Sequence, residues 1–416
     1  MANLRDRLKR INNIKKTEQS LINQENNNEI PELINLGWEP CGYKVYKREV
    51  LSKFLIIPDN ILPEAITIVI PDLSAGFSGR KLPEINDFLF FDLETTGLSG
   101  GAGTVAFLAA FGRITKQACL KEHHAGSSAA SAGSFAASAE ENSIYSGKDE
   151  SILVITQYLL LDYPGETDFL SNVLSEIRKD TSVVVSYNGK CFDSQILRTR
   201  CLMNRMKPPV YLHADLLHPA RRLWKKIIHD CSQISVESHI LNIKRIDDIP
   251  GSLAPVIWFE FLKTGKTDML SGICDHNKDD ITGLASIFSA MIKIAENPFD
   301  TEKYQFDLER LALYWRCYVH DALASQRQEN HAVSDEIRKN GISLLRYAAG
   351  KNHPRAVYKY AYDLMKNGDY KESYEFVKKG LALFEEGTPN EISSDSVWHE
   401  KLLRRKERLE KKLINR

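Results

Sequence analysis

Residues 88–104 place two acids at the end of a strongly apolar segment. Phe88–Leu93 is apolar and aromatic, which predicts a strand buried on both faces. Asp92 and Glu94 stand two residues apart, so on a strand both side chains point to the same side. Unpaired carboxylates are costly there, and a divalent cation would offset that cost. The alternative is a polar strand end followed by a flexible loop.

A glycine-rich turn follows this strand. Thr95 and Gly97 end the strand, and the glycines up to Gly103 leave the turn free of side chains, so another backbone or a ligand can approach closely. The sequence Gly-Lys-Ser/Thr does not follow, which excludes a P-loop.

Length and composition set the broad class. The 416 residues suffice for two or three domains, and the equal totals of 55 basic and 55 acidic residues give no overall bias toward nucleic acid. The seven cysteines include no CxxC pair, which predicts reduced thiols in a cytoplasmic protein. No apolar signal core or membrane-spanning stretch is evident, so we expect no membrane association.

Strand and helix patterns alternate after the acidic strand. Strands are predicted at Val105–Ile114, Leu153–Asp162 and Thr181–Ser186, with an amphipathic helix at Glu166–Lys179. This alternation predicts an α/β domain. Residues 123–149 are mostly Ala, Ser and Gly, which predicts a flexible insertion with no metal role for its histidines.

A third acid follows the next buried strand. Asn188 and Lys190 lie at its carboxyl end, and Asp193 is near the start of the following helix. Ligand sites in open α/β sheets gather at such strand ends, so Asp193 is well placed to meet a metal held by Asp92 and Glu94. Alternatively, Asp193 only complements the helix dipole.

Two further segments carry charged groups. After a short strand at Val210–Leu212, Arg221, Arg222, Lys225 and Lys226 form a basic ridge on a helix, which suits either solvent or a phosphate backbone. Asp247–Gly251 has the composition of a structural turn.

The last helix of the α/β region begins near Lys266. His276 and Asp280 are four residues apart and therefore share one face of it. Taken alone, His276 would be a surface residue at a polar helix start.

The remaining chain divides into an N-terminal and a C-terminal part. Residues 1–84 are predicted to be a partly flexible appendage with short β-favouring pieces at Tyr43–Tyr46 and Ile66–Ile70. From about Asp300 the chain is helical, and Ala356–Phe384 has the helix, turn, helix spacing of a tetratricopeptide unit. Such units usually bind protein partners.

Together, these motifs resemble the DEDD superfamily of metal-dependent 3′–5′ exonucleases, which has a ribonuclease H-like fold. Asp92 and Glu94 match its first signature, Asn188 through Asp193 its second, and His276 with Asp280 its third. The sequence around Asp92 looks like that of the YprB-like branch of this superfamily. The motifs Asp-Asp-Ile-Pro-Gly and His-Asn-x-x-Asp-Ile resemble the same branch. That branch often joins such a domain to tetratricopeptide-like helices. The resemblance covers roughly residues 85–295 well.

The resemblance implies that the chain has three parts. An α/β ribonuclease H-like domain, with a mixed central sheet flanked by helices, would span residues 85–297 and be followed by an all-α tetratricopeptide-like region at 298–416. The appendage at 1–84 would precede them.

The resemblance also implies a two-metal-ion hydrolysis of phosphodiester bonds in DNA or RNA. Two ions, Mg²⁺ or Mn²⁺, would be held by four acids: Asp92, Glu94, Asp193 and Asp280. His276 would orient or deprotonate the attacking water. The substrate would be contacted by Thr95, Gly97, Asn188, Lys190, Arg221 and Arg222.

One departure concerns the last helix. In the superfamily, His usually precedes the last Asp by five residues and Tyr by four, whereas here His276 precedes Asp280 by four. Asp279 is a second candidate for the fourth ligand. The alternative function is a catalytically weak nucleic-acid-binding or adaptor protein that acts through its helical repeats.

Overall fold

A computed structural model describes residues 30–53, 62–75, 83–97, 103–116, 151–178, 183–325, 334–386 and 392–414. The predicted insertion at 123–149 lies outside them. The described residues form two compact units. The first unit takes residues up to 58, 86–211 and 245–285, and the second takes 59–85, 212–244 and 286–416.

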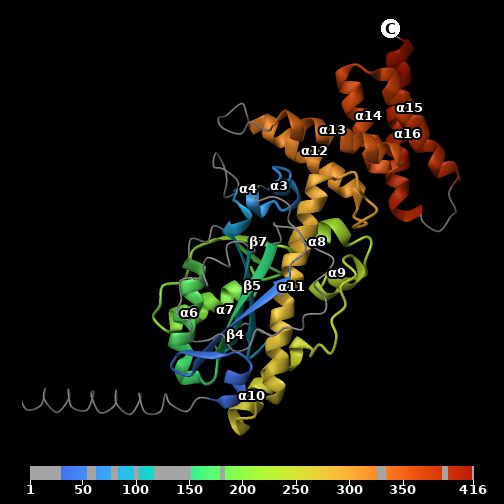
Figure 1. The fold of residues 1–416 in the computed structure, drawn as a ribbon. Coiled ribbons are helices and arrows are strands. Elements are labelled where there is room, and N and C mark those ends of the chain that lie inside the picture. The colour runs from blue at the N-terminus through green and yellow to red at the C-terminus, as the bar shows by residue number, and fades with distance from the viewer. Residues whose placement is uncertain are drawn as a thin grey trace, which may run out of the picture. The chain divides into compact units, whose positions relative to one another are not determined.

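Seven strands form one mixed sheet in the order β1-β2-β5-β4-β3-β6-β7 (Figure 1). β3 and β6 are parallel, whereas β1–β2, β2–β5, β5–β4 and β4–β3 are antiparallel pairs. The strands are β1 Glu39–Gly42, β2 Val45–Lys53, β3 Phe88–Thr95, β4 Ala106–Lys116, β5 Ser151–Leu160, β6 Val183–Ser186 and β7 Leu212–Asp215. The predicted mixed central sheet flanked by helices is confirmed, and it is consistent with a ribonuclease H-like fold.

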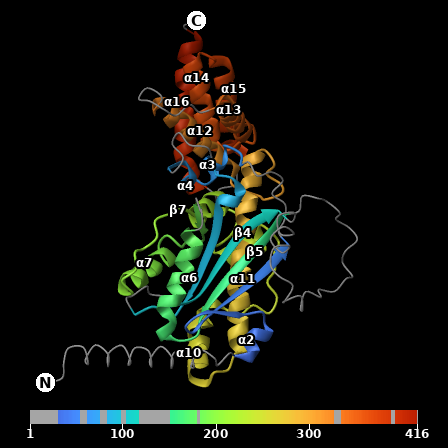
Figure 2. The ribbon, with the colours of Figure 1, turned by 60° about the vertical axis from the view of Figure 1, so that its left-hand side comes forward.

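Helices cover both faces of the sheet in the first unit (Figure 2). They are α2 Pro31–Asn35, α6 Glu166–Arg178, α7 Asp193–Met203, α10 Ala254–Thr264 and the first part of α11 Asp268–Glu296. On one face, the Tyr158 hydroxyl of β5 donates to Glu176 of α6 at 2.8 Å. On the other face, Ile281 of α11 packs directly over Gly112 of β4.

Strand β3 is the centre of this core, as its apolar sequence predicted. All four residues from Phe88 to Phe91 are fully buried. Phe91 stacks on Phe111 of β4 with ring centroids 5.1 Å apart. Because side chains alternate along the strand, Phe90 and Asp92 share the opposite face, which α11 covers.

Residues 39–53, which we expected in an N-terminal appendage, supply β1 and β2. β2 pairs with β5 along the whole length of β2, from Val45 with Leu160 to Lys53 with Ile152. Lys47, Arg48 and Glu49 interrupt the apolar alternation that would have identified β2 as a core strand.

Two short elements differ from their predictions. Ile66–Ile70, predicted to be β-favouring, contains helix α3 at Ile66–Val69. Its side chains are fully enclosed, and tertiary packing overrides the β propensity of branched residues there. The strand predicted at Val210–Leu212 is displaced to Leu212–Asp215, and Val210 is 94% exposed.

The second unit is largely helical. Besides α3 it contains α4 Asp72–Ala75, α8 Leu217–Trp224, α9 Gln233–His239, α12 Leu308–Ser325, α13 Asp335–Gly350, α14 Pro354–Asn367, α15 Tyr370–Glu386 and α16 Ile392–Ile414. Each helix from α12 to α15 packs against the next one in sequence. Gly368, with a left-handed φ of 91°, ends α14 before α15.

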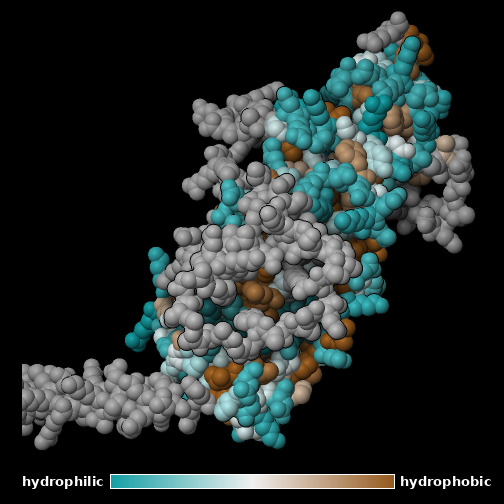
Figure 3. Space-filling model, viewed as in Figure 1, coloured by the Kyte–Doolittle hydropathy of each residue, from teal (hydrophilic) through white to brown (hydrophobic). Residues whose placement is uncertain are grey.

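The predicted helical C-terminal region is therefore confirmed, whereas its tetratricopeptide character stays a prediction. The face of these helices visible in Figure 3 is mostly hydrophilic, with scattered hydrophobic side chains. Among the described helices, none combines the length and the apolar character needed to cross a membrane.

The contact between Gly112 and Ile281 gives a test of the packing of α11 on the sheet. A Cβ at Gly112 would lie 2.5 Å from Ile281 Cγ2, so Gly112→Ala should lower the unfolding free energy by about 1–3 kcal/mol. Gly350→Ala is the control, because nothing lies within 4 Å of its added Cβ. Equal thermal melting temperatures for the two variants, measured by circular dichroism, would contradict this packing.

Candidate active site

Strand β3 brings the first two predicted ligands to the face covered by α11. Asp92 pairs with Ala110 of β4, and Glu94 pairs with Leu108. Both residues are mostly buried, and the Glu94 side chain is 12% exposed. They point to the same side of the sheet, as their spacing predicted.

Helix α11 brings His276 and Asp280 to the same place. His276 Nε2 lies 3.3 Å from Asp280 Oδ2 and 3.9 Å from Glu94 Oε1. One ligand atom from each of Glu94, His276 and Asp280 falls within 4.8 Å of the others, a spacing at which the three residues could hold a metal ion. Residues 182 positions apart in the sequence thus meet at one point.

Asp193 is the first residue of α7 and is buried. Its negative charge contributes to the raised pKa of Glu94, so it lies within electrostatic range of the same acids. Gly189 makes room for it, because a Cβ there would lie 2.8 Å from Asp193 Oδ2. The loop before α7 therefore fits closely around this carboxylate.

Burial and the neighbouring carboxylates raise the pKa values of Asp92 and Glu94. Burial, and then the charge of Asp280, raises the pKa of Asp92 from 3.8 to about 7. Burial, followed by Asp92 and Asp280, holds the pKa of Glu94 well above its ordinary value. Burial removes water from these carboxylates, and neighbouring negative charges repel one another, so both effects disfavour the ionised forms. A bound cation would favour the ionised forms instead.

Asp92 is the first of four residues that form a row across the sheet. Asp92 pairs with Ala110, Ala110 with Gln157 of β5, and Gln157 with Arg48 of β2. Cross-strand partners share a face, so all four face α11. The small Ala110 leaves a space between Asp92 and Gln157.

Asn277 of α11 bridges that space. Its amide nitrogen donates to Asp92 Oδ2 at 2.7 Å, and its oxygen accepts from Gln157 Nε2 at 3.0 Å. Arg48 Nε in turn donates to Gln157 Oε1 at 2.7 Å. Asn277 and Gln157 are fully buried, and this chain of hydrogen bonds fixes the orientation of the Asp92 carboxylate.

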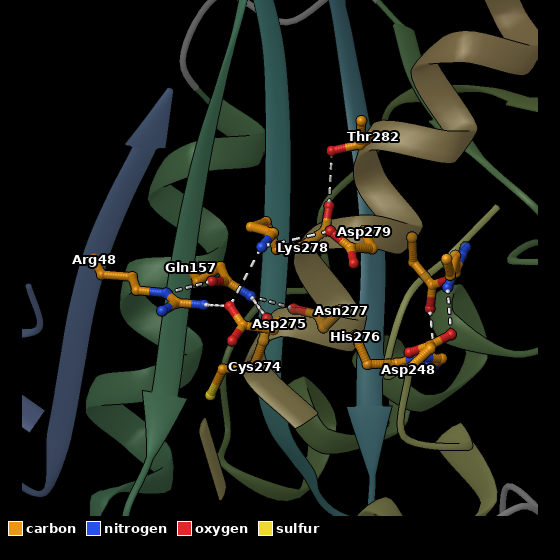
Figure 4. Close-up of polar contacts among 12 residues, drawn as sticks. Arg48, Gln157, Asp248, Cys274, Asp275, His276, Asn277, Lys278, Asp279 and Thr282 are labelled. Carbon is orange, nitrogen blue, oxygen red and sulfur yellow. Dashed lines mark hydrogen bonds and ion pairs between the residues drawn. The ribbon is translucent and has the colours of Figure 1, made fainter. Parts of the chain in front are cut away.

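The loop before α10 supplies a second group of contacts. His276 Nδ1 and Asp248 Oδ1 are 2.6 Å apart, and Arg245 Nη2 contacts Asp280 Oδ1 at 2.7 Å. In Figure 4, the contacts of Arg48 and Gln157 and the contact between His276 and Asp248 lie to either side of helix α11.

Sequence analysis did not select these supporting residues. Asp248 belongs to a segment interpreted as a structural turn, and its partner His276 is 28 residues away. Gln157 offered one usable signal. The run Ile152–Leu161 is apolar except for the hydroxyl groups of Thr156 and Tyr158 and the amide of Gln157. A buried strand seldom carries an amide without a partner.

Some residues that were predicted to contact substrate lie in turns near the acids. Thr95 Oγ1 donates to the Gly97 carbonyl at 3.0 Å, which closes the end of β3. Asn188 is exposed and has a left-handed φ of 65°. Lys190 is partly exposed in the same loop before α7. Their contact with substrate stays a prediction.

The predicted basic ridge belongs to the second unit. Arg222 is half-buried and stacks over the Tyr314 ring at 3.8 Å, so it packs within that unit. Lys226 pairs with Asp307 at 3.2 Å. Arg221 is exposed on α8. A phosphate contact by either arginine stays a prediction.

Two known relationships match this geometry. Residues 142–292 match the family model described as RNase_H superfamily, a range that contains Asp193, His276 and Asp280. The chain is also 35% identical over 211 residues to "Uncharacterized protein YprB" of Bacillus subtilis (strain 168). That similarity covers 50% of this chain and 42% of the relative, so the chain matches less than half of the relative's length.

The match over residues 142–292 and the mixed sheet are both consistent with a ribonuclease H-like fold. Proteins of this superfamily are typically nucleases that act on nucleic acid with the help of divalent ions. The cluster of Glu94, His276 and Asp280 provides a possible metal site.

The raised pKa of Asp92 predicts how stability depends on pH in the metal-free protein. The folded protein retains a proton up to about pH 7, whereas the unfolded chain releases it near pH 3.8, so stability falls as pH rises through this window. Asp92→Asn has no carboxyl group to ionise at this position, so this variant should not lose stability in that pH window. Its melting temperature in EDTA should exceed the parent's above pH 7, by roughly 2–4 °C for each kcal/mol relieved.

The two melting temperatures should converge toward pH 4. Curves of melting temperature against pH that stay parallel from pH 4 to pH 8 would show that burial of Asp92 does not cost stability.

Proposed function

We propose that this chain is a DEDD-type, metal-dependent 3′–5′ exonuclease that hydrolyses phosphodiester bonds of DNA or RNA. The observation that carries the proposal is the convergence of acids from three separate elements. Asp92 and Glu94 come from β3, Asp193 from α7 and Asp280 from α11. Their charges act on one another, as the raised pKa of Glu94 records.

These residues fit divalent ions. The acids that affect Glu94 are Asp92, Asp280, Asp193 and Asp248, whereas Arg245 contributes one positive charge among them. The excess of negative charge, mostly buried around Glu94, favours a hard cation with oxygen ligands. Asp92, Glu94, Asp193 and Asp280 would hold two ions, Mg²⁺ or Mn²⁺.

Divalent ions at this position would supply an activated water and stabilise the negative charge that develops on the phosphate. The chain's own residues prepare the site. Asn277 orients Asp92 by its hydrogen bond, and Arg245 holds one oxygen of Asp280, leaving the other oxygen on the side of His276 and Glu94. Fixed ligand positions reduce the reorganisation needed during the reaction.

A nuclease assay tests the proposal. Asp92→Ala, Glu94→Ala and Asp193→Ala should each lower hydrolysis of a 5′-labelled oligonucleotide by roughly 10²–10⁴-fold, because each removes a metal ligand. Product ladders that shorten one nucleotide at a time from the 3′ end are expected. Separate single- and double-stranded DNA and RNA substrates define the preferred class.

Full activity in excess EDTA would refute the metal-dependent reaction. Binding of the oligonucleotide without any hydrolysis, in Mg²⁺ and in Mn²⁺, would instead favour the alternative of a catalytically weak binding or adaptor protein.

Helix α11 offers a matched pair of variants. Asp280 is 18% exposed at its side chain and pairs with Arg245, whereas Asp279 is 40% exposed and pairs with its neighbour Lys278. Asp280→Asn should therefore reduce hydrolysis by roughly 10²-fold or more, and Asp279→Asn should change it little. Melting curves should establish that both variants are folded. Equal loss of activity would contradict the assignment of Asp280 as the fourth ligand.

A further inference from the structure

The contacts of His276 define which of its ring nitrogens faces the acids. Nδ1 lies 2.6 Å from Asp248 Oδ1. A carboxylate oxygen accepts hydrogen bonds, so the neutral tautomer that satisfies this contact has its proton on Nδ1. The neutral ring then has its lone pair on Nε2, which is the nitrogen near Glu94 and Asp280.

The distances around Nε2 suit a metal ion. Asp280 Oδ2 is 3.3 Å away, and Glu94 Oε1 is 3.9 Å away. Ligand atoms around an ion that is bound at ~2.1 Å are separated by roughly 3–4 Å. Nε2 and the two oxygens therefore have the spacing of three ligands to one ion.

Asp248 and Arg245 hold two of these ligands from behind. Arg245 Nη2 binds Asp280 Oδ1 at 2.7 Å, so the other oxygen of Asp280 is the one beside His276. Arg245 Nη1 also lies 3.4 Å from Asp248 Oδ2, which joins the two supports. Outer contacts of this kind fix the ring orientation and tautomer of metal-bound histidines.

Gly251 keeps the space beside Nε2 open. A Cβ at this position would lie 2.9 Å from His276 Nε2 and 3.8 Å from Glu94 Oε1. Gly251 begins a short 3₁₀ helix, Gly251–Leu253, that directly precedes α10. A bare backbone thus borders the point on which the three ligand atoms converge.

We propose that His276 is itself a metal ligand, through Nε2, of one of the divalent ions, together with Glu94 and Asp280. This inference rests on the proposed metal-dependent function and replaces the role of His276 as general base. Asp248 and Arg245 are positioning residues for the ligands. Because imidazole suits transition ions better than Mg²⁺, this centre favours Mn²⁺ over Mg²⁺.

A competing arrangement has the same contacts without a metal bond. A doubly protonated His276 would then form ion pairs with Asp248 and Asp280, and the ions would be held by carboxylates alone. The two arrangements differ in whether a nitrogen is bonded to the metal.

Electron spin echo envelope modulation of the full chain, loaded with less than one equivalent of Mn²⁺, detects such a bond. We expect ¹⁴N modulation from an imidazole, which should disappear in His276→Gln and change to the ¹⁵N pattern when the parent protein carries ¹⁵N-histidine. The isotope comparison needs no variant, so absence of a change to the ¹⁵N pattern overturns the inference even if His276→Gln fails to fold.

Metal affinity provides the second readout. Asp248→Ala should weaken Mn²⁺ binding by roughly 10–100-fold in calorimetric titrations, because the ring loses its support. The matched control is Asp247→Asn, since Asp247 is exposed and has a left-handed φ of 53° that asparagine tolerates. Equal Mn²⁺ affinity in Asp248→Ala and Asp247→Asn would contradict the positioning role.

The outcomes separate this inference from the proposed function. Mn²⁺ binding without ¹⁴N modulation, in an active nuclease, overturns His276 as a ligand and leaves the nuclease intact. Failure to bind Mn²⁺, together with absence of hydrolysis, overturns both. Nitrogen modulation that persists in folded His276→Gln shows a different histidine at the metal and also overturns the inference.

Discussion

The burial of several carboxylates around one point is the constraint on which the first unit depends. Asp92 and Glu94 follow the fully buried residues Phe88 to Phe91 on β3. They lie within electrostatic range of Asp280 from α11 and Asp193 from α7. Without a cation, burial and the neighbouring acids raise the pKa values of Asp92 and Glu94, and this repulsion lowers the stability of the folded protein. Keeping such a cluster lowers the stability of the folded protein. Clusters of this kind are expected at functional sites.

The surrounding residues make this cluster possible. On one side, Arg48, Gln157 and Asn277 form a buried chain of hydrogen bonds that ends on Asp92. On the other side, Arg245 and Asp248 hold Asp280 and His276. Helix α11 connects both groups, because Asn277 and His276 are adjacent in sequence. The packing of Ile281 against Gly112 sets the distance between this helix and the sheet.

Local patterns sufficed to predict β3, α6 and α11, since apolar periodicity and the spacing of His276 and Asp280 are short-range properties. They did not reveal β2, whose pairing with β5 joins residues about 100 positions apart. The partnership of Asp248 with His276 was missed for the same reason. A basic ridge on α8 could be recognised from sequence, but the stacking of Arg222 on Tyr314 could not. Long-range contacts thus account for most of what sequence analysis left out.

The central claim is that these acids form one metal centre. Anomalous X-ray diffraction from crystals of the full chain soaked in Mn²⁺ tests it most directly. The account predicts a strong anomalous peak in contact with Asp92, Glu94 and Asp280. Absence of a peak at these residues, while Mn²⁺ occupies another position and the pair of Arg245 and Asp280 is intact, would contradict it.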